Sequence, residues 1–419
     1  MGETPLLLTV AGVFVFGKEH TMVSEQMYEL GTKKSTIRTI FEYGQKRAAE
    51  VGAENVFDFS LGNPNVPTPD FIRDAAIDIL THSDPMEVHG YTIAPGKPHV
   101  REVLAADLNK RFGMEFTGKN LFLTAGAAAS ITITFKALAE AGDEFVTIAP
   151  FFPEYRVFVE ACGGKLIVVP AKTDDFQIDF AALAEAITQH TKAVIINSPN
   201  NPSGAVYSGE TLRQLAELLR KKETEFGHPI FIIADEPYRE IVYDGVSVPC
   251  IPLFYDNTIV CYSYSKSFSL PGERIGYIVV PDKVADFARI YGAIAGAARV
   301  LTHVNAPSLW QLVIARCAGR NADLSTYAHN AKLLYEGLSA SGFSCMRPQG
   351  AFYLFPKALE EDDAAFCARA REFDLLLVPG RDFGCPGYFR AAYCVRTAMI
   401  ERALPRFQKL AESYKDPHE

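Results

Sequence analysis

Lys266 is the residue in this sequence whose surroundings point most directly to chemistry. It stands between serines in the segment SYSKSFSLPGERIGY (263–277), directly after a short apolar run. An isolated lysine is usually a solvated surface residue. Here Ser263, Ser265 and Arg274 supply two hydroxyls and a planar guanidinium, and this set suits a phosphate dianion. The segment therefore predicts a lysine that is held beside a phosphate group.

Asp235 ends a second apolar run, in the segment IIADEPYRE (232–240). An aspartate at such a position often caps the following turn. The functional interpretation is a carboxylate that faces a pyridinium nitrogen, since pyridoxal phosphate (PLP) withdraws electrons only while its ring nitrogen stays protonated. Tyr238, three residues on, is then placed to donate to the phenolate oxygen of PLP.

Two more segments follow apolar runs and carry groups that suit a cofactor. The segment INSPNNPSGAVY (196–207) is a rigid turn that fixes Asn201 as an amide donor. In LTAGAAASITITF (123–135) a strand gives way to a helix near Ala127, and N–H groups at a helix start bind phosphate. Small residues there also permit tight packing, so this second signal is weak by itself.

The segment APFFPEY (149–155) places two aromatic residues after another apolar run. Phe151 and Phe152 belong to the core by default. One of them is also able to stack on a flat ring.

In combination and order, these motifs identify a family resemblance. The sequence resembles the fold-type I PLP enzymes, specifically the class I/II aminotransferases of the aspartate aminotransferase type. The matching motifs are N-P-x-G at 201–204, D-x-P-Y at 235–238, and S-x-S-K with a downstream R-x-G at 263–276. The resemblance covers nearly the whole chain, from LGNP (61–64) and HGYT (89–92) to GAFY (350–353) and GYFR (387–390).

The resemblance implies a role for each matching residue. Lys266 forms the Schiff base with PLP and later moves the proton. The other cofactor contacts that it implies are Asp235 at the ring nitrogen, Tyr238 and Asn201 at the phenolate oxygen, Phe152 against the ring, and Ser263, Ser265, Arg274, Ala127 and Ala128 around the phosphate. Tyr91 reaches the phosphate of a neighbouring subunit, which implies a homodimer with shared sites. Arg390 binds the substrate α-carboxylate through two parallel bonds, with help from Gly62 and Asn201.

The expected reaction is transfer of an amino group between an L-amino acid and a 2-oxo acid. A carbon–sulfur β-lyase is the main alternative, because the same fold and lysine serve both reactions and the outcome depends on how the substrate is positioned. A PLP-binding regulator without turnover is the alternative from another class. The chain has no basic face or appended helix-turn-helix pattern that would favour such a regulator.

The amino acid that the enzyme uses is less defined. Bacterial aspartate-type relatives often carry a lysine in the turn that reads GAAA here, where it meets the distal carboxylate, and this chain has Ala128 near that position. Arg299 is the best remaining cation for a side-chain carboxylate, and we expect it to arrive from a partner subunit. The interpretation of Arg299 as an ordinary surface residue is at least equally good.

The spacing of apolar segments predicts how these residues are positioned. Strand-like runs are expected at 121–124, 144–149, 166–169, 193–197, 230–234, 259–262 and 277–280, and an amphipathic helix at 210–226. Continuous apolar strands that alternate with helices indicate an α/β fold, with a mostly parallel sheet covered by helices. Ligands of such sheets bind beyond the carboxyl ends of the strands.

The chain is expected to divide into a large PLP-binding domain at 66–288 and a smaller α+β domain at 289–419. Residues 1–65 form an N-terminal extension and arm, whose helical part at 25–50 packs with the small domain. In the small domain, the segments GAFYLF and FDLLLVP suggest two short strands with a helix between them.

The composition is that of an ordinary globular protein, with 419 residues, 48% of them hydrophobic, and a net charge of −9. A nucleic-acid partner is not expected, because no basic stripe is visible. The eight cysteines are dispersed, without C-x-x-C pairs, and read as reduced thiols of a cytoplasmic protein without a metal site. The apolar run at 5–16 is too short to span a bilayer, and Met22 is an alternative start of the chain.

Overall fold

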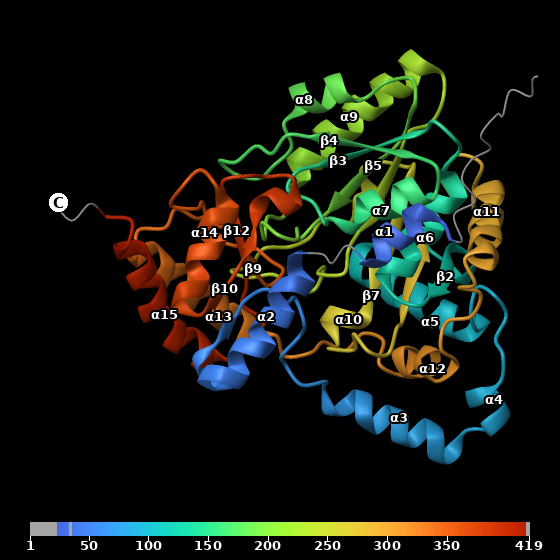
Figure 1. The fold of residues 1–419 in the computed structure, drawn as a ribbon. Coiled ribbons are helices and arrows are strands. Elements are labelled where there is room, and N and C mark those ends of the chain that lie inside the picture. Colours follow the sequence, from blue (N-terminus) through green and yellow to red (C-terminus); the bar gives the residue numbers. More distant parts are fainter. Residues whose placement is uncertain (1–22, 33–35, 416–419) are drawn as a thin grey trace, which may run out of the picture.

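In the computed structural model of the protein, residues 23–32 and 36–415 are described. They form a large unit around one sheet and a smaller unit that combines residues 36–58 with residues after 324 (Figure 1). No helix within these residues is long and apolar enough to cross a membrane. The apolar run at 5–16 and Met22 lie outside the described residues.

A seven-stranded sheet forms the centre of the large unit, in the order β2-β8-β7-β6-β5-β3-β4. Its neighbouring strands run parallel, except that β8 is antiparallel to both β2 and β7. The strands are β2 (Leu121–Thr124), β3 (Glu144–Ile148), β4 (Lys165–Val169), β5 (Thr191–Asn197), β6 (Phe231–Asp235), β7 (Thr258–Ser263) and β8 (Gly276–Val279). The seven predicted runs coincide with these strands to within one or two residues, and the α/β prediction is confirmed.

Helices cover both faces of this sheet. Side chains alternate along a strand, so Ile232 and Ala234 of β6 enter one core while Phe231 and Ile233 enter the other. The helices of the first face are α3 (Asp70–His82), α5 (Pro98–Phe112), α8 (Phe180–Ala186), α9 (Gly209–Phe226) and α12 (Ser308–Arg316). Those of the second face are α6 (Ala127–Leu138), α7 (Glu154–Ala161) and α11 (Phe287–Val300).

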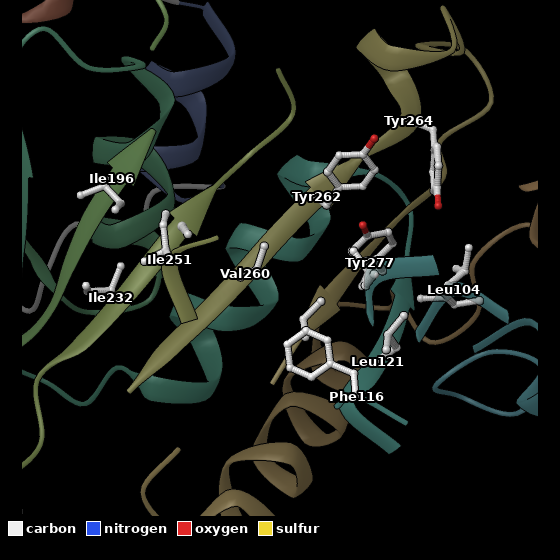
Figure 2. Close-up of a cluster of buried hydrophobic side chains, with 14 of the residues drawn as sticks. Leu104, Phe116, Leu121, Ile196, Ile232, Ile251, Val260, Tyr262, Tyr264 and Tyr277 are labelled. Atoms are coloured by element: carbon white, nitrogen blue, oxygen red, sulfur yellow. The ribbon is translucent and has the colours of Figure 1, made fainter. Parts of the chain in front are cut away.

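Figure 2 shows part of the first core, where Ile196, Ile232 and Val260 extend side by side from the neighbouring strands β5, β6 and β7. Tyr262, Tyr264 and Tyr277 gather beside them. This packed layer fixes the ends of the strands that carry the polar residues.

Helix α9 illustrates why the predicted helix forms where it does. Ser208 caps its start, because its side chain accepts a hydrogen bond from the backbone N–H of Thr211 at 3.0 Å. The helix ends before Gly227, which takes the left-handed conformation with φ 75°. Leu212, Leu215 and Leu219 between these caps form its buried stripe.

The smaller unit joins an early segment of the chain, residues 36–58, to the segment that follows residue 324. Strand β1 pairs in parallel with β10, and a second sheet has the order β11-β12-β9. Its elements are α2 (Thr36–Val51), β1 (Phe57–Asp58), α13 (Ser325–Ala340), β9 (Tyr353–Leu354), α14 (Asp363–Ala370), β10 (Leu375–Leu376), β11 (Val378–Pro379), β12 (Phe389–Ala392) and α15 (Thr397–Glu412). The segments GAFYLF and FDLLLVP hold β9 and β10 with α14 between them, while β12 begins in the segment GYFR.

Helices α11 and α12 pack against the large sheet unit and not against the small one. Helix α11 contacts α6, and α12 contacts α3 and α5. The sequence pattern predicts a small domain that starts at residue 289 and so includes most of these two helices. We therefore propose a boundary between Arg316, where α12 ends, and Ser325, where α13 begins.

Candidate active site

A cavity of about 310 Å³ lies where the carboxyl ends of β5, β6 and β7 meet the start of α6 and the small unit. All of the predicted site residues except Tyr91 and Arg299 line this cavity. They are Gly62, Ala127, Ala128, Phe152, Asn201, Asp235, Tyr238, Ser263, Ser265, Lys266, Arg274 and Arg390. The cavity thus brings together residues that are far apart in the sequence.

Lys266 lies on the short helix α10 (Tyr264–Ser267), directly after β7. Its Nζ donates a hydrogen bond to the carbonyl oxygen of Gly62 at 2.7 Å and lies 5.5 Å from the ring centre of Phe352. Burial lowers the pKa of Lys266 to about 8, and the nearby positive charges of Arg390 and Arg274 act in the same direction. The neutral, nucleophilic form of this amine is therefore far more populated near neutral pH than that of an ordinary lysine.

Asp235, the last residue of β6, has one satisfied and one unsatisfied oxygen. The hydroxyl of Tyr155 donates to Oδ2 at 2.5 Å, while the buried Oδ1 has no hydrogen-bond partner among the described residues. Burial raises the pKa of Asp235 to about 7, against the opposing hydrogen bond from Tyr155. A buried acceptor without a partner is costly, and a ligand with a protonated ring nitrogen would satisfy it.

The start of α6 and the segment after Lys266 form a cradle for an anion. The first amides of α6 follow Gly126, and a Cβ atom at Gly126 would lie 2.9 Å from Nη2 of Arg274. Ser263 caps α10 and donates to the hydroxyl of Ser265 at 2.8 Å. Backbone amides, hydroxyls and a guanidinium on one wall make a site suited to phosphate.

Arg390 on β12 approaches the cavity from the small unit. Its Nη1 donates to Oδ1 of Asn201 at 3.1 Å, and its Nη2 donates to the carbonyl oxygen of Ser60 at 2.5 Å. The buried Nε has no partner among the described residues. A guanidinium carries five N–H donors, so Arg390 retains donors for a carboxylate.

Phe152 and Phe151 diverge at the end of β3. Phe152 lines the cavity, whereas Phe151 is buried in the second core and hydrogen-bonds through its amide to the carbonyl of Phe383. Of the two aromatic residues, Phe152 is thus the one in position to meet a flat ring.

The structure adds site residues that the sequence interpretation did not assign. Asn197 accepts a hydrogen bond from the amide of Asn201 at 2.7 Å and donates to the carbonyl of Asp235 at 2.8 Å. Tyr155 holds Asp235, and Tyr353 contacts Tyr238 through their hydroxyls at 3.0 Å. Their motifs, INSPNNP, FFPEY and GAFY, were visible, but nothing in them identified the partner across the fold. Ile37, on α2, also lines the cavity.

Tyr91 and Arg299 lie apart from the residues that line the cavity in this chain. Tyr91 is 100% exposed in the segment between α4 (Pro85–His89) and α5. Arg299 is exposed in the last turn of α11. Neither side chain contributes to the cavity wall of its own subunit.

The comparisons with known proteins agree with this geometry. The family model for class I and II aminotransferases matches residues 54–407. A probable aspartate/prephenate aminotransferase from Aquifex aeolicus is 30% identical over 390 residues, covering 87% of this chain and 94% of that relative. An aspartate aminotransferase from Geobacillus stearothermophilus is also 30% identical, with coverage of 88% and 95%.

Solved structures give the same result. An amino transferase from Eubacterium rectale is 55% identical, has a TM-score of 0.93, and matches over 94% of this chain and 100% of that chain. The aspartate aminotransferase of Thermus thermophilus with maleate is 25% identical, has a TM-score of 0.80, and matches over 93% and 99%. The chain therefore belongs to the class I and II aminotransferase family.

Proposed function

We propose that this protein is a PLP-dependent aminotransferase that moves an amino group between an L-amino acid and a 2-oxo acid. The observation that carries the cofactor assignment is Oδ1 of Asp235, which is buried without a hydrogen-bond partner in residues 23–32 and 36–415 and lies in the same cavity as the amine of Lys266. Leaving such an acceptor unsatisfied costs about 1–3 kcal/mol. A protonated pyridine nitrogen supplies the missing donor and a compensating positive charge.

The other lining residues have the chemistry to hold the rest of PLP. Tyr238 and Asn201 supply donors for the phenolate oxygen, and Phe152 supplies a ring for stacking. The phosphate cradle consists of Ser263, Ser265, Arg274 and the amides of Ala127 and Ala128. When bound, PLP supplies an electron-withdrawing ring that accepts the charge left behind when a proton leaves the substrate α-carbon.

Lys266 bonds the cofactor in the resting enzyme and carries the proton during the reaction. Once an incoming amine has displaced it, its Nζ would take the proton from the substrate α-carbon and would later give that proton up again. The lowered pKa of about 8 supports this role, because a base works best with a pKa near the working pH.

Arg390 binds the α-carboxylate and thereby orients the α-proton towards Lys266. The proposal is supported by Nε, which has no partner in the part of the chain that the structure describes, and by the two bonds that already fix the guanidinium plane. The backbone of Gly62 and the side chain of Asn201 border the same space.

The substrate side chain is proposed to be acidic, as in aspartate or glutamate. The names of the reported relatives, which are aspartate and aspartate/prephenate aminotransferases, support this choice. Among the described lining residues the cations are Lys266, Arg274 and Arg390, and each has another role. A distal carboxylate therefore needs a further cation, for which Arg299 of a second subunit is the candidate.

A homodimer with shared sites is part of the proposal. Tyr91 is fully exposed and does not line the cavity of its own chain, so it is available for contact with a neighbouring subunit. In a dimer, Tyr91 is expected to reach the phosphate in the neighbouring site. A cytoplasmic location is proposed from the eight cysteines, all of which are free thiols.

The reaction is tested with a panel of amino acids and 2-oxoglutarate. The proposal predicts release of a 2-oxo acid that depends on 2-oxoglutarate. Pyruvate release from cystathionine is measured alongside, in the absence of any oxo acid. Efficient pyruvate release without transamination would replace the proposal with the lyase reaction.

A further inference from the structure

Tyr353 lies between Arg390 and Tyr238 in the candidate active site. It lies on β9, is 2% exposed, and lines the cavity. The antiparallel register pairs Tyr353 with Ala392 of β12. Arg390 is two residues before Ala392 on the same strand, so the side chains of Tyr353 and Arg390 are diagonal neighbours on one face of the sheet.

The ring of Tyr353 contacts the guanidinium of Arg390. The guanidinium carbon lies 4.7 Å from the ring centre of Tyr353 and 4.9 Å from that of Phe383. Both distances are within the range of an attractive cation–π contact. The two rings restrict the plane of the guanidinium, while its bonds to Asn201 and Ser60 fix the direction of its ends.

The hydroxyl of Tyr353 contacts Tyr238, whereas its ring contacts Arg390. It lies 3.0 Å from the hydroxyl of Tyr238. Burial raises the pKa of Tyr353 to about 12 and raises that of Tyr238 well above its ordinary value, so both hydroxyls keep their protons near neutral pH. Each of the two hydroxyls carries one hydrogen, and only one of these hydrogens takes part in the hydrogen bond between the two oxygens. If Tyr353 donates, the hydrogen of Tyr238 is directed into the cavity.

The absence of a side chain at Gly62 leaves the space that the hydroxyl of Tyr353 occupies. A Cβ atom at Gly62 would lie 2.0 Å from the hydroxyl oxygen of Tyr353, so a larger residue than glycine would displace the ring. The carbonyl of Gly62 is also the acceptor of Lys266. Tyr353 is thus packed against three parts of the site at once.

We propose that Tyr353 is a positioning residue that holds Arg390 with its ring and directs the hydroxyl of Tyr238 with its own. This inference rests on the proposed function, in which Arg390 binds the α-carboxylate and Tyr238 donates to the cofactor. The two contacts use different parts of one side chain, so two substitutions separate them.

The test uses Tyr353→Phe, which keeps the ring and removes the hydroxyl, and Tyr353→Leu, which removes both. Tyr335→Phe, outside the cavity lining, is the matched control. Two properties are measured on the full-length protein loaded with PLP. One is the pH midpoint of the bound cofactor's absorbance. The other is the dissociation constant of two unreactive carboxylates, maleate and hydrocinnamate.

Tyr353→Phe is expected to raise the pH midpoint by about half a unit, because a less well directed Tyr238 stabilises the phenolate less. Its affinity for the carboxylates should stay within about twofold of the original protein, since the ring remains. Tyr353→Leu is expected to show the same rise in midpoint and to weaken both carboxylates about two- to tenfold.

Unchanged midpoints in both variants would overturn the hydroxyl role, and unchanged carboxylate affinity in Tyr353→Leu would overturn the ring role. Should Tyr353→Leu fail to fold, Phe383→Leu tests the same restriction of Arg390 from the other side, with weaker carboxylate binding expected and unaltered binding as the contrary result. Failure of the proposed function is distinguishable, because the unsubstituted protein would then bind no PLP, or would release pyruvate from cystathionine without transamination.

Discussion

Replacement of Arg390 tests how the substrate is held. In Arg390→Ala the α-carboxylate loses two parallel, charge-assisted hydrogen bonds, each worth about 1.5–3 kcal/mol. The combined loss of about 3–6 kcal/mol corresponds to a roughly 10²- to 10⁴-fold fall in kcat/KM. The fall should be equal for acidic and neutral amino acids, because every substrate carries the α-carboxylate.

The same substitution removes the donors that Asn201 and the carbonyl of Ser60 now use. Part of any loss would therefore be structural, and Arg390→Lys is the necessary companion. Lysine keeps the charge but not the planar fork, so kcat/KM should fall by an intermediate amount. The assay is steady-state transamination with 2-oxoglutarate, with PLP content and thermal unfolding measured on each variant.

An unchanged kcat/KM in a folded, PLP-loaded Arg390→Ala protein would refute the assignment. A loss confined to acidic substrates would also refute it, because Arg390 would then bind the side chain.

The remaining predictions concern charge at three other positions. Asp235→Asn replaces the ring-nitrogen partner with a neutral group, and kcat should fall by roughly 10²- to 10³-fold, the effect of breaking a buried ion pair; near-normal turnover would contradict that role. In the PLP-free protein, reaction of Lys266 with an amine-selective acylating reagent should increase with pH through a midpoint near 8, since its neutral form predominates only above this pKa; a midpoint near 10.5, the value of an ordinary lysine, would contradict the burial argument. Arg299→Ala should lower kcat/KM for aspartate or glutamate by a factor that corresponds to about 2–4 kcal/mol, while kcat/KM for alanine and aromatic amino acids stays almost unchanged. Equal losses for all substrates would assign Arg299 to structure or the dimer, and no loss would make it a surface residue.

The positions of the strands were predictable because buried parallel strands leave continuous apolar runs. Phe231–Asp235 is an example, with every side chain buried. The polar residues at the ends of these runs were predictable for the same reason, since parallel strands deliver their carboxyl ends to one edge of the sheet. Asp235 and Lys266 therefore meet in one cavity, as their motifs indicated.

The partners of these residues were not predictable from one sequence. Tyr155 and Asp235 are 80 residues apart, and Tyr353 and Tyr238 are 115 apart. The first contact depends on how α7 packs on the large sheet and the second on how the two units pack, and local patterns encode neither. A domain boundary in this region is hard to place for the same reason, because the apolar faces of α11 and α12 are compatible with packing on either unit until the tertiary structure is known.

The central claim, that Lys266 holds the cofactor, has a direct chemical test. Purified protein supplied with PLP should be yellow, and borohydride reduction should abolish the absorbance band and fix the pyridoxyl group covalently. Mass spectrometry of the digested protein is expected to find that group on Lys266, and Lys266→Ala should yield no adduct. An adduct on a different lysine, or no absorbance band after PLP is added, would contradict the account.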